Sequence, residues 1–219
     1  CHSFDRRKEG WGEKMNKKTT YVGINGPPGI GKTTILAALE GLGYKIHVIV
    51  RYYTRPRRPG EENSREYKFV TEEEFKKLKD CGFFVRGTIR EVKVNEGTYH
   101  LGLLKRQLWL PIPKGTDLVV CLFGKAGINQ RHNFPKMKLV FISSRSPETL
   151  RVRLMERCRA HGIDPVLKFE KVKRYKQLRV EKHYDVVVYN DGTPEECARE
   201  IAKIVGLPER PSTNSDPQL

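Results

Sequence analysis

The chain has 219 residues, 37% of them hydrophobic and 31% charged, which suits one compact domain with insertions better than two independent domains. Its formal charge of +16 favours anionic ligands such as nucleotides, phosphorylated metabolites or nucleic acid, without choosing among them. No apolar run approaches the roughly 20 residues that cross a bilayer, and the five cysteines are dispersed without a Cys-x-x-Cys pair. The composition therefore argues against a membrane protein and a disulfide framework, and we expect a cytoplasmic location.

The two ends of the chain differ in composition from the rest. Residues 1–14 have neither the apolar core of a signal peptide nor a clear periodicity, so we expect them to be disordered or a translation artefact. Residues 207–219 are rich in Pro, Ser and Asn and predict a disordered tail. Residues 15–206 then form the expected domain.

Between these ends, strand-like and helix-like segments alternate. Runs of apolar and β-branched residues predict strands at residues 20–25, 44–50, 117–123, 138–143 and 185–189. Capping-box spacings and the cap-then-Pro pattern predict helix starts at Thr71, Ser146 and Thr193. Strands that are buried on both faces and separated by helices predict an α/β fold, with a parallel sheet flanked by helices.

A glycine-rich segment joins the first predicted strand to the helix predicted at residues 34–40. Residues 26–33, GPPGIGKT, fit the pattern G-x-x-x-x-G-K-[ST] in that setting. Its glycines let successive backbone N–H groups point inward, and the helix N-terminus adds partial positive charge, so the loop can cradle the β- and γ-phosphates of a nucleotide. Lys32 would neutralise charge on the departing γ-phosphoryl group, and the Thr33 hydroxyl would ligate Mg²⁺. The predicted ATP-binding residues are Gly26, Gly29, Gly31, Lys32, Thr33 and Thr34.

A cationic strip follows the second predicted strand. Residues 51–61, RYYTRPRRPGE, place arginines among tyrosines and prolines. Guanidinium groups bind phosphate through two hydrogen bonds, and tyrosine hydroxyls add further ones, so the strip suits a fixed phosphomonoester. A solvated basic loop or a nucleic-acid patch is the alternative.

The strip resembles the guanylate kinase family, which carries T-R-x-x-R-x-G-E followed by D-Y-x-F-V. The matching residues are Thr54, Arg55, Arg58, Gly60, Glu61, Tyr67, Phe69 and Val70. The likeness extends from about residue 20 to about residue 205. It implies a P-loop NTPase three-layer fold with an acceptor-binding insertion at about 51–105 and a lid at about 153–175.

The same resemblance implies roles for individual residues. Arg55, Arg58, Tyr67 and Tyr99 would hold the phosphate of the acceptor. Asn190 would lie near the adenine of ATP. The lid arginines that close over the transferring phosphate would be Arg153, Arg157 and Arg174.

The chain departs from the family where guanine is read. The family uses a Ser, a Glu and an Asp, whereas this chain has Arg51, Arg86 and Phe123-Gly124 at these places. A site without those carboxylates should lose base discrimination, unless Glu91 or Glu96 substitutes. We assign Arg51, Thr54 and Arg86 to the acceptor site with the phosphate-binding residues.

Several functions remain open from the sequence. The leading prediction is an ATP-dependent kinase for a nucleoside monophosphate, with GMP as the default acceptor. A second is a kinase for a phosphopentose, because Arg51-Tyr52-Tyr53-Thr54-Arg55 and the basic turn Gly124-Lys125 also resemble ribose 1,5-bisphosphate phosphokinase. The others are a non-catalytic guanylate-kinase-like binding module and, less expected, a nucleic-acid-binding protein.

Overall fold

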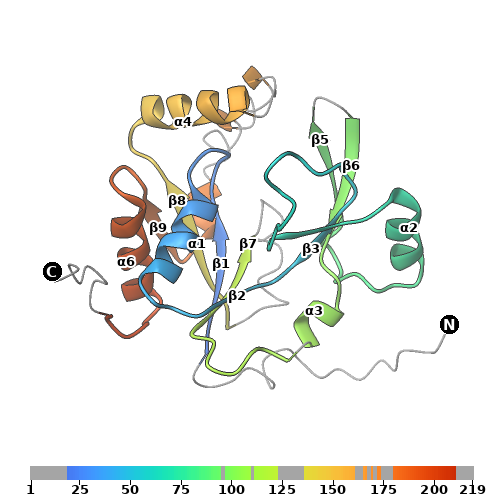
Figure 1. The fold of residues 1–219 in the computed structure, drawn as a ribbon, viewed down its shortest axis with the longest axis horizontal. Helices are drawn as coiled ribbons and strands as arrows, with labels where there is room; N and C mark the ends of the chain where they lie inside the picture. The colour runs from blue at the N-terminus through green and yellow to red at the C-terminus, as the bar shows by residue number, and fades with distance from the viewer. Residues whose placement is uncertain are drawn as a thin grey trace, which may run out of the picture.

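The computed structural model describes residues 19–94, 97–109, 111–122, 136–160, 165–166, 169, 172–173 and 180–210. Two β-sheets organise these residues (Figure 1). Among them, no helix is long and apolar enough to cross a membrane.

The larger sheet has five parallel strands in the order β2-β7-β1-β8-β9. The strands are β1 (Thr20–Asn25), β2 (Ile46–Val48), β7 (Leu118–Leu122), β8 (Lys138–Ser143) and β9 (Val186–Tyr189). Every residue of β7 is buried, as expected for a parallel strand covered on both faces. The predicted α/β fold with its parallel sheet is confirmed.

Helices follow the strands where the sequence predicts them. The predicted helices are α1 (Lys32–Gly41), α2 (Glu72–Asp80), α4 (Pro147–Ala160) and α6 (Pro194–Ile204). The structure adds a short helix α3 (Arg106–Trp109) and a 3₁₀ turn η3 (Val180–His183), which the sequence does not predict. Thr71 and Thr193 each form a complete capping box with the glutamate three residues later. These caps satisfy backbone N–H groups that a helix leaves unpaired at its start.

The two faces of the larger sheet are covered by different parts of the chain. On one face, Val22 and Ile24 pack with Leu39 of α1 and Ile201 of α6. On the other face, alternate strand residues such as Tyr21 pack with Val85 and Leu103 from the region between β3 and β7. This second contact fastens the inserted region to the sheet that carries the glycine-rich loop.

The inserted region forms a second sheet, in the order β4-β3-β6-β5. Its strands are β3 (Arg51–Tyr53), β4 (Tyr67–Phe69), β5 (Arg90–Val94) and β6 (Gly97–Gly102). Helix α2 covers one face, where Phe75 packs with Tyr52 and Phe84. A Cβ on Gly102 would lie 2.6 Å from the Phe84 ring, so this packing requires glycine.

The boundary expected at residue 206 needs correction. Leu207 is buried, and its backbone N–H donates to Ala202. Arg210 forms an ion pair with Asp117, 2.8 Å between nitrogen and oxygen. Residues 207–210 therefore pack on the domain, because an apolar side chain and an ion pair hold them there, while residues 1–18 and 211–219 lie outside the described part.

Candidate active site

The glycine-rich loop runs from the end of β1 to the start of α1, beneath α4 in the view of Figure 1. Gly31 is the N-cap of α1, with a positive φ of 90°, and no side chain caps this helix. A Cβ on Gly26 would lie 2.4 Å from the carbonyl oxygen of Ile142, and one on Gly31 would lie 2.9 Å from the amide nitrogen of Asn190. The tight backbone therefore needs glycine, and the N-terminal amides of α1 have no side-chain cap.

Lys32 and Thr33 extend from the start of α1 in different directions. The Lys32 ammonium donates to the carbonyl oxygens of Gly26 (3.0 Å) and Pro27 (3.1 Å), so it lies across the loop. The Thr33 hydroxyl donates to a carboxylate oxygen of Glu66, at 2.7 Å. Thr34, another predicted nucleotide-binding residue, is exposed in the first turn of α1.

Asn190 joins the loop to the end of β9. It is 3% exposed, and its amide nitrogen donates to the carbonyl oxygen of Ile30 at 2.7 Å. Its carboxamide oxygen is buried without a hydrogen-bond partner. Arg153 of α4 donates to the backbone carbonyl of Asn190 at 2.9 Å, and Gly29 lies against Leu154. Helix α4 is thereby held beside the loop.

One face of the second, smaller sheet, with the loop after β3, carries the predicted acceptor-binding residues Arg51, Arg55, Arg58 and Tyr67, which we call the arginine clamp. Strand register places Arg51 opposite Tyr67, and Tyr53 opposite Phe69, so these side chains share a face. Arg51 donates to the Tyr67 hydroxyl at 2.9 Å and lies over that ring. Its Nε is buried without a hydrogen-bond partner. Arg55 lies over the rings of Tyr53 and Phe69, 5.0 Å from each centroid.

Arg55 is held by an ion pair to Glu61, 2.6 Å between nitrogen and oxygen. The second carboxylate oxygen of Glu61 accepts from the backbone N–H of Arg58 at 3.1 Å. Burial would raise the pKa of the Glu61 carboxyl, but the hydrogen bonds from Arg55 and Arg58 outweigh it and hold that pKa below its usual range. Glu61 therefore fixes the shape of the loop that presents both arginines.

Arg58 has a different environment from Arg55. Burial and then the charge of Arg55 lower the pKa of its guanidinium; Glu61 and Tyr53 raise that pKa in part, and Arg157 lowers it more weakly. Within the described residues, no carboxylate forms an ion pair with the Arg58 guanidinium. Positive charges from the clamp and from α4 thus face a common region, which favours an anion there.

The other predicted acceptor residues lie in different places. Tyr99 is half-buried on β6. It shares a sheet face with Leu101, which pairs with Tyr53, so Tyr99 lies on the clamp face. Thr54 bonds instead to the Glu72 carboxylate and the backbone N–H of His100, towards α2.

The other predicted residues lie away from this cluster or outside the described part of the chain. Arg86 is exposed in the turn after Val85, and within the described residues no hydrogen bond or ion pair joins it to the clamp. Glu91 pairs with His100, so it lies on the face opposite the clamp. Arg174, Glu96 and Phe123-Gly124 lie outside the described residues.

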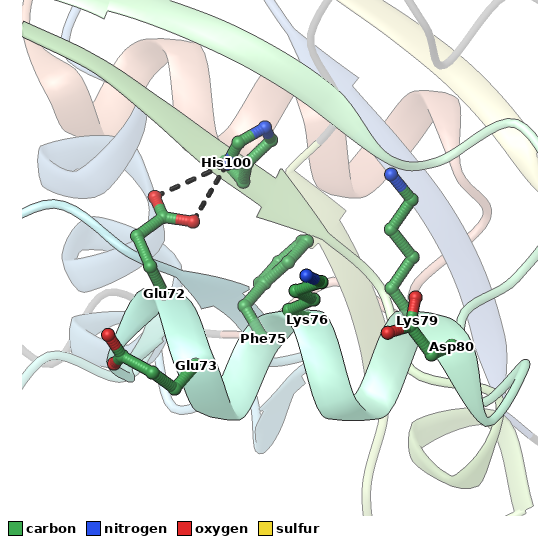
Figure 2. Close-up of a pocket in the computed structure, with 7 residues that line it drawn as sticks. All are labelled: Glu72, Glu73, Phe75, Lys76, Lys79, Asp80 and His100. Atoms are coloured by element: carbon green, nitrogen blue, oxygen red, sulfur yellow. Dashed lines mark hydrogen bonds and ion pairs between the residues drawn. The ribbon is translucent and has the colours of Figure 1, made fainter.

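A separate cavity of about 450 Å³ lies along α2 (Figure 2). Figure 2 shows His100 above Phe75 and facing Glu72. The Nδ1 atom of His100 lies 3.0 Å from a carboxylate oxygen of Glu72. Because His100 and Phe75 are on the α2 face of the small sheet, this cavity is on the other side from the arginine clamp and is not part of the candidate site.

The glycine-rich loop and the arginine clamp meet at the start of α1. Besides the contact between Thr33 and Glu66, Arg65 forms an ion pair with Glu40 at 2.6 Å. Thr33 and Glu40 are two turns apart and share a face of α1. A glycine-rich loop at the end of a parallel strand, joined at the start of its helix to an inserted sheet that carries a cationic clamp, is the arrangement of a P-loop phosphotransferase, a kinase that uses ATP.

Comparisons with known proteins identify the family. The family model described as guanylate kinase matches residues 17–88. The chain is 31% identical over 190 residues to a guanylate kinase of Legionella pneumophila strain Paris, covering 87% of this chain and 86% of that protein. It is 32% identical to one from Aromatoleum aromaticum, covering 78% of this chain and 80% of that protein. The chain therefore belongs to the guanylate kinase family.

A solved structure supports the fold. The crystal structure of guanylate kinase from Anaplasma phagocytophilum matches with a TM-score of 0.57 and 22% identity, over 88% of this chain and 87% of that one. The P-loop fold expected from the sequence is thus confirmed.

Sequence reasoning did not assign the residues that organise the clamp. The sequence pattern includes Glu61 only as part of the G-E match and gives Glu66 no role. The available signals were local: an acidic residue follows the arginines, and another directly precedes Tyr67. Their contacts depend on the turn at residues 61–66, which no periodic pattern describes.

Proposed function

We propose that this protein transfers the γ-phosphoryl group of ATP to GMP, giving ADP and GDP. The observation that carries the proposal is the 2.7 Å contact between Thr33 of the phosphate loop and Glu66 beside the clamp, because it brings the donor and acceptor halves together. The relatives named above, which are guanylate kinases, support GMP as the acceptor.

The residues present fit ATP and Mg²⁺. Glycine is required at Gly26 and Gly31, the start of α1 has no side-chain cap, and Asn190 carries an orphaned buried acceptor. Within the described residues, no group of three or more His, Cys, Asp or Glu could hold a metal alone. Mg²⁺ usually binds through few protein oxygens together with phosphates, so Thr33 suits it.

The chain's own residues would act mainly by positioning and by charge. When bound, ATP would supply the phosphoryl group, and Mg²⁺ would neutralise negative charge on the β- and γ-phosphate oxygens of ATP. Lys32 would stabilise charge that develops as the bond between the γ-phosphorus and its bridging oxygen breaks. Arg55, Arg58, Tyr67 and Tyr99 would hold the phosphate of GMP, whose oxygen forms the new bond to phosphorus.

The arginines of α4 would complete the site. Arg153 donates a hydrogen bond to the backbone carbonyl of Asn190. Arg157 is exposed, and its charge lowers the pKa of the Arg58 guanidinium. Movement of α4 towards the clamp would exclude water and limit hydrolysis of ATP. We propose the same role for Arg174.

Acceptor identity is tested by measuring ATP consumption with Mg²⁺ and a panel of GMP, dGMP, AMP and the phosphopentose precursor of ribose 1,5-bisphosphate. We expect turnover with GMP, and its loss in Lys32→Ala with an unchanged circular dichroism spectrum. Turnover with the phosphopentose alone would overturn the proposal. So would the absence of turnover combined with DNA or RNA affinity that falls steeply with salt.

A further inference from the structure

Glu66 connects the two halves of the site. Its backbone carbonyl accepts from the N–H of Arg51 at 3.0 Å, so the main chain at this position is held against β3. Its side chain reaches the other way, to the Thr33 hydroxyl at the start of α1. Glu66 is half-buried and Thr33 is exposed, so an ion from solvent can reach both oxygens.

The usual source of a metal-binding carboxylate is missing from this chain. In P-loop enzymes the metal is held by the loop Ser or Thr and by an Asp of a neighbouring strand. Here the sequence contains no Asp or Glu from Leu118 to Pro147, a range that includes all of β7 and β8 and the segment between them. A carboxylate for the metal must therefore come from another element.

Two other carboxylates, Glu61 in the turn after β3 and Asp191 after β9, already accept hydrogen bonds from neighbouring groups. Glu61 accepts hydrogen bonds from Arg55 and from the backbone of Arg58. Asp191 accepts from Ser144 and from the backbone of Arg145. Among the described residues, Glu66 is the carboxylate that contacts Thr33.

We propose that Glu66 is a magnesium ligand of this protein and acts together with Thr33, directly or through one water. The inference rests on the proposed use of ATP with Mg²⁺. The oxygens of Thr33 and Glu66 are 2.7 Å apart, and neighbouring ligand oxygens around an octahedral Mg²⁺ are about 2.9 Å apart, given bonds of 2.0–2.1 Å. Both oxygens can therefore bind one ion after a shift of a few tenths of an ångström.

The role has an electrostatic consequence that a purely structural role lacks. A carboxylate beside the phosphates repels a nucleotide without metal and attracts one that carries a cation. Removing the charge of Glu66 should therefore weaken metal binding without weakening nucleotide binding in the absence of metal. Glutamine is a suitable replacement because its amide oxygen still accepts from Thr33.

The test measures Mn²⁺ binding by electron paramagnetic resonance, with the full chain and ADP. In Glu66→Gln we expect Mn²⁺ affinity of the protein–ADP complex to fall about tenfold or more. ADP affinity in the presence of EDTA should stay the same or rise. Glu62→Gln is the matched control, because it removes the same charge from an exposed residue of the same turn, and it should leave Mn²⁺ affinity unchanged.

A second control distinguishes metal binding by Glu66 from a purely structural role, in which Glu66 only holds the turn at residues 61–66 against α1. Arg65→Ala removes the other contact between this turn and α1, the ion pair to Glu40. If Glu66 acts only by docking the turn, Arg65→Ala will reproduce the loss of Mn²⁺ affinity, and the proposal is overturned. Unchanged Mn²⁺ affinity in Glu66→Gln overturns it too.

Failure of the metal-ligand role of Glu66 can be distinguished from failure of the proposed function. If wild-type protein phosphorylates GMP while Glu66→Gln retains full Mn²⁺ affinity, only the metal-ligand role is wrong. If wild-type protein binds ADP with Mn²⁺ and Glu66→Gln does not, but GMP is not phosphorylated, the metal role holds and the acceptor is wrong. A wild-type protein that binds no ADP with Mn²⁺ contradicts both.

Discussion

Neighbouring arginines of the clamp differ in what holds their guanidinium groups. Arg55 is paired with Glu61, whereas the Arg58 group is half-buried near other cations and should gain most from an anionic acceptor. We expect Arg58→Ala to raise the KM for GMP about 10- to 100-fold, because a hydrogen bond to a charged group contributes about 1.5–3 kcal/mol. The kcat should change little, since the contact is made before and during transfer.

Arg57→Ala serves as the control for this prediction in steady-state kinetics. Arg57 is exposed and lies 5.7 Å from the centre of the Phe69 ring, and its loss should change the KM by no more than about twofold, as for an exposed cation–π contact. Equal effects of the two substitutions would show that the strip attracts phosphate diffusely and that Arg58 is not a specific ligand.

The ion pair of Glu61 predicts a dependence of stability on pH. The pKa of this carboxyl is lowered in the folded protein, whereas an unfolded Glu titrates near about 4.3. Its contribution is therefore fully present above the unfolded pKa and is lost as pH falls through the folded value. Urea unfolding should show Glu61→Gln less stable than wild type at pH 7, with a smaller difference at about pH 3.5. A constant difference would contradict an ionised pair.

At the scale of elements, helices α2 and α6 have the same cap but different burial. Both begin with a threonine capping box, yet α2 buries only Phe75 whereas α6 buries four residues. We expect Thr71→Ala to cost about 1 kcal/mol, mainly as local opening of α2, because few apolar contacts tie that helix to the core.

Thr193→Ala should have a comparable cost that appears instead in the free energy of global unfolding. Native-state hydrogen exchange separates these outcomes, because it reports the opening of each helix individually. Thr71→Ser, which keeps the hydroxyl, should restore protection in α2. Uniform loss of protection across both helices in Thr71→Ala would contradict the difference in burial.

The elements themselves were unequally predictable. Residues 20–25 and 138–143 were predicted as strands with the observed bounds, because a strand buried on both faces is a continuous apolar run. The expected strand at residues 44–50 instead ends at Val48, and the chain then enters the second sheet at Arg51. The arginines and tyrosines of β3 predict a cationic strip and give no strand signal, since neither face of that strand is uniformly apolar.

On the scale of the whole molecule, burial in the core makes the cysteine thiols differ in reactivity. Burial raises the pKa of the Cys121 thiol to about 12, and burial with the Glu200 charge raises that of Cys197 to about 12. Cys81 is exposed. Because the thiolate is the reactive form, iodoacetamide should label Cys81 in native protein, and Cys121 and Cys197 only in urea. Peptide mapping checks this, and native labelling of Cys121 would mean that the larger sheet opens.

The two sheets together decide which residues can act as one site. Leu103 and Val85 pack against Tyr21 and Val119 of the larger sheet, so the clamp is carried on the same core as the phosphate loop. Thr54 shows the limit of reading a motif along the chain, because it belongs to the matched run yet bonds towards α2. Register and packing, which join residues far apart in sequence, set that difference.

The sequence alone determined the part of this protein that carries the glycine-rich loop. The glycine-rich loop, its flanking strand and helix and the capping boxes are local features, and each depends on residues within a few positions of one another. Only the tertiary structure decided how the sheet that carries the arginine clamp lies against it. Glu66 contacts Thr33, and Arg58 lies within electrostatic reach of Arg157 of α4. These residues are tens of positions apart in the sequence. Their proximity therefore depends on packing of the whole core and not on any local pattern.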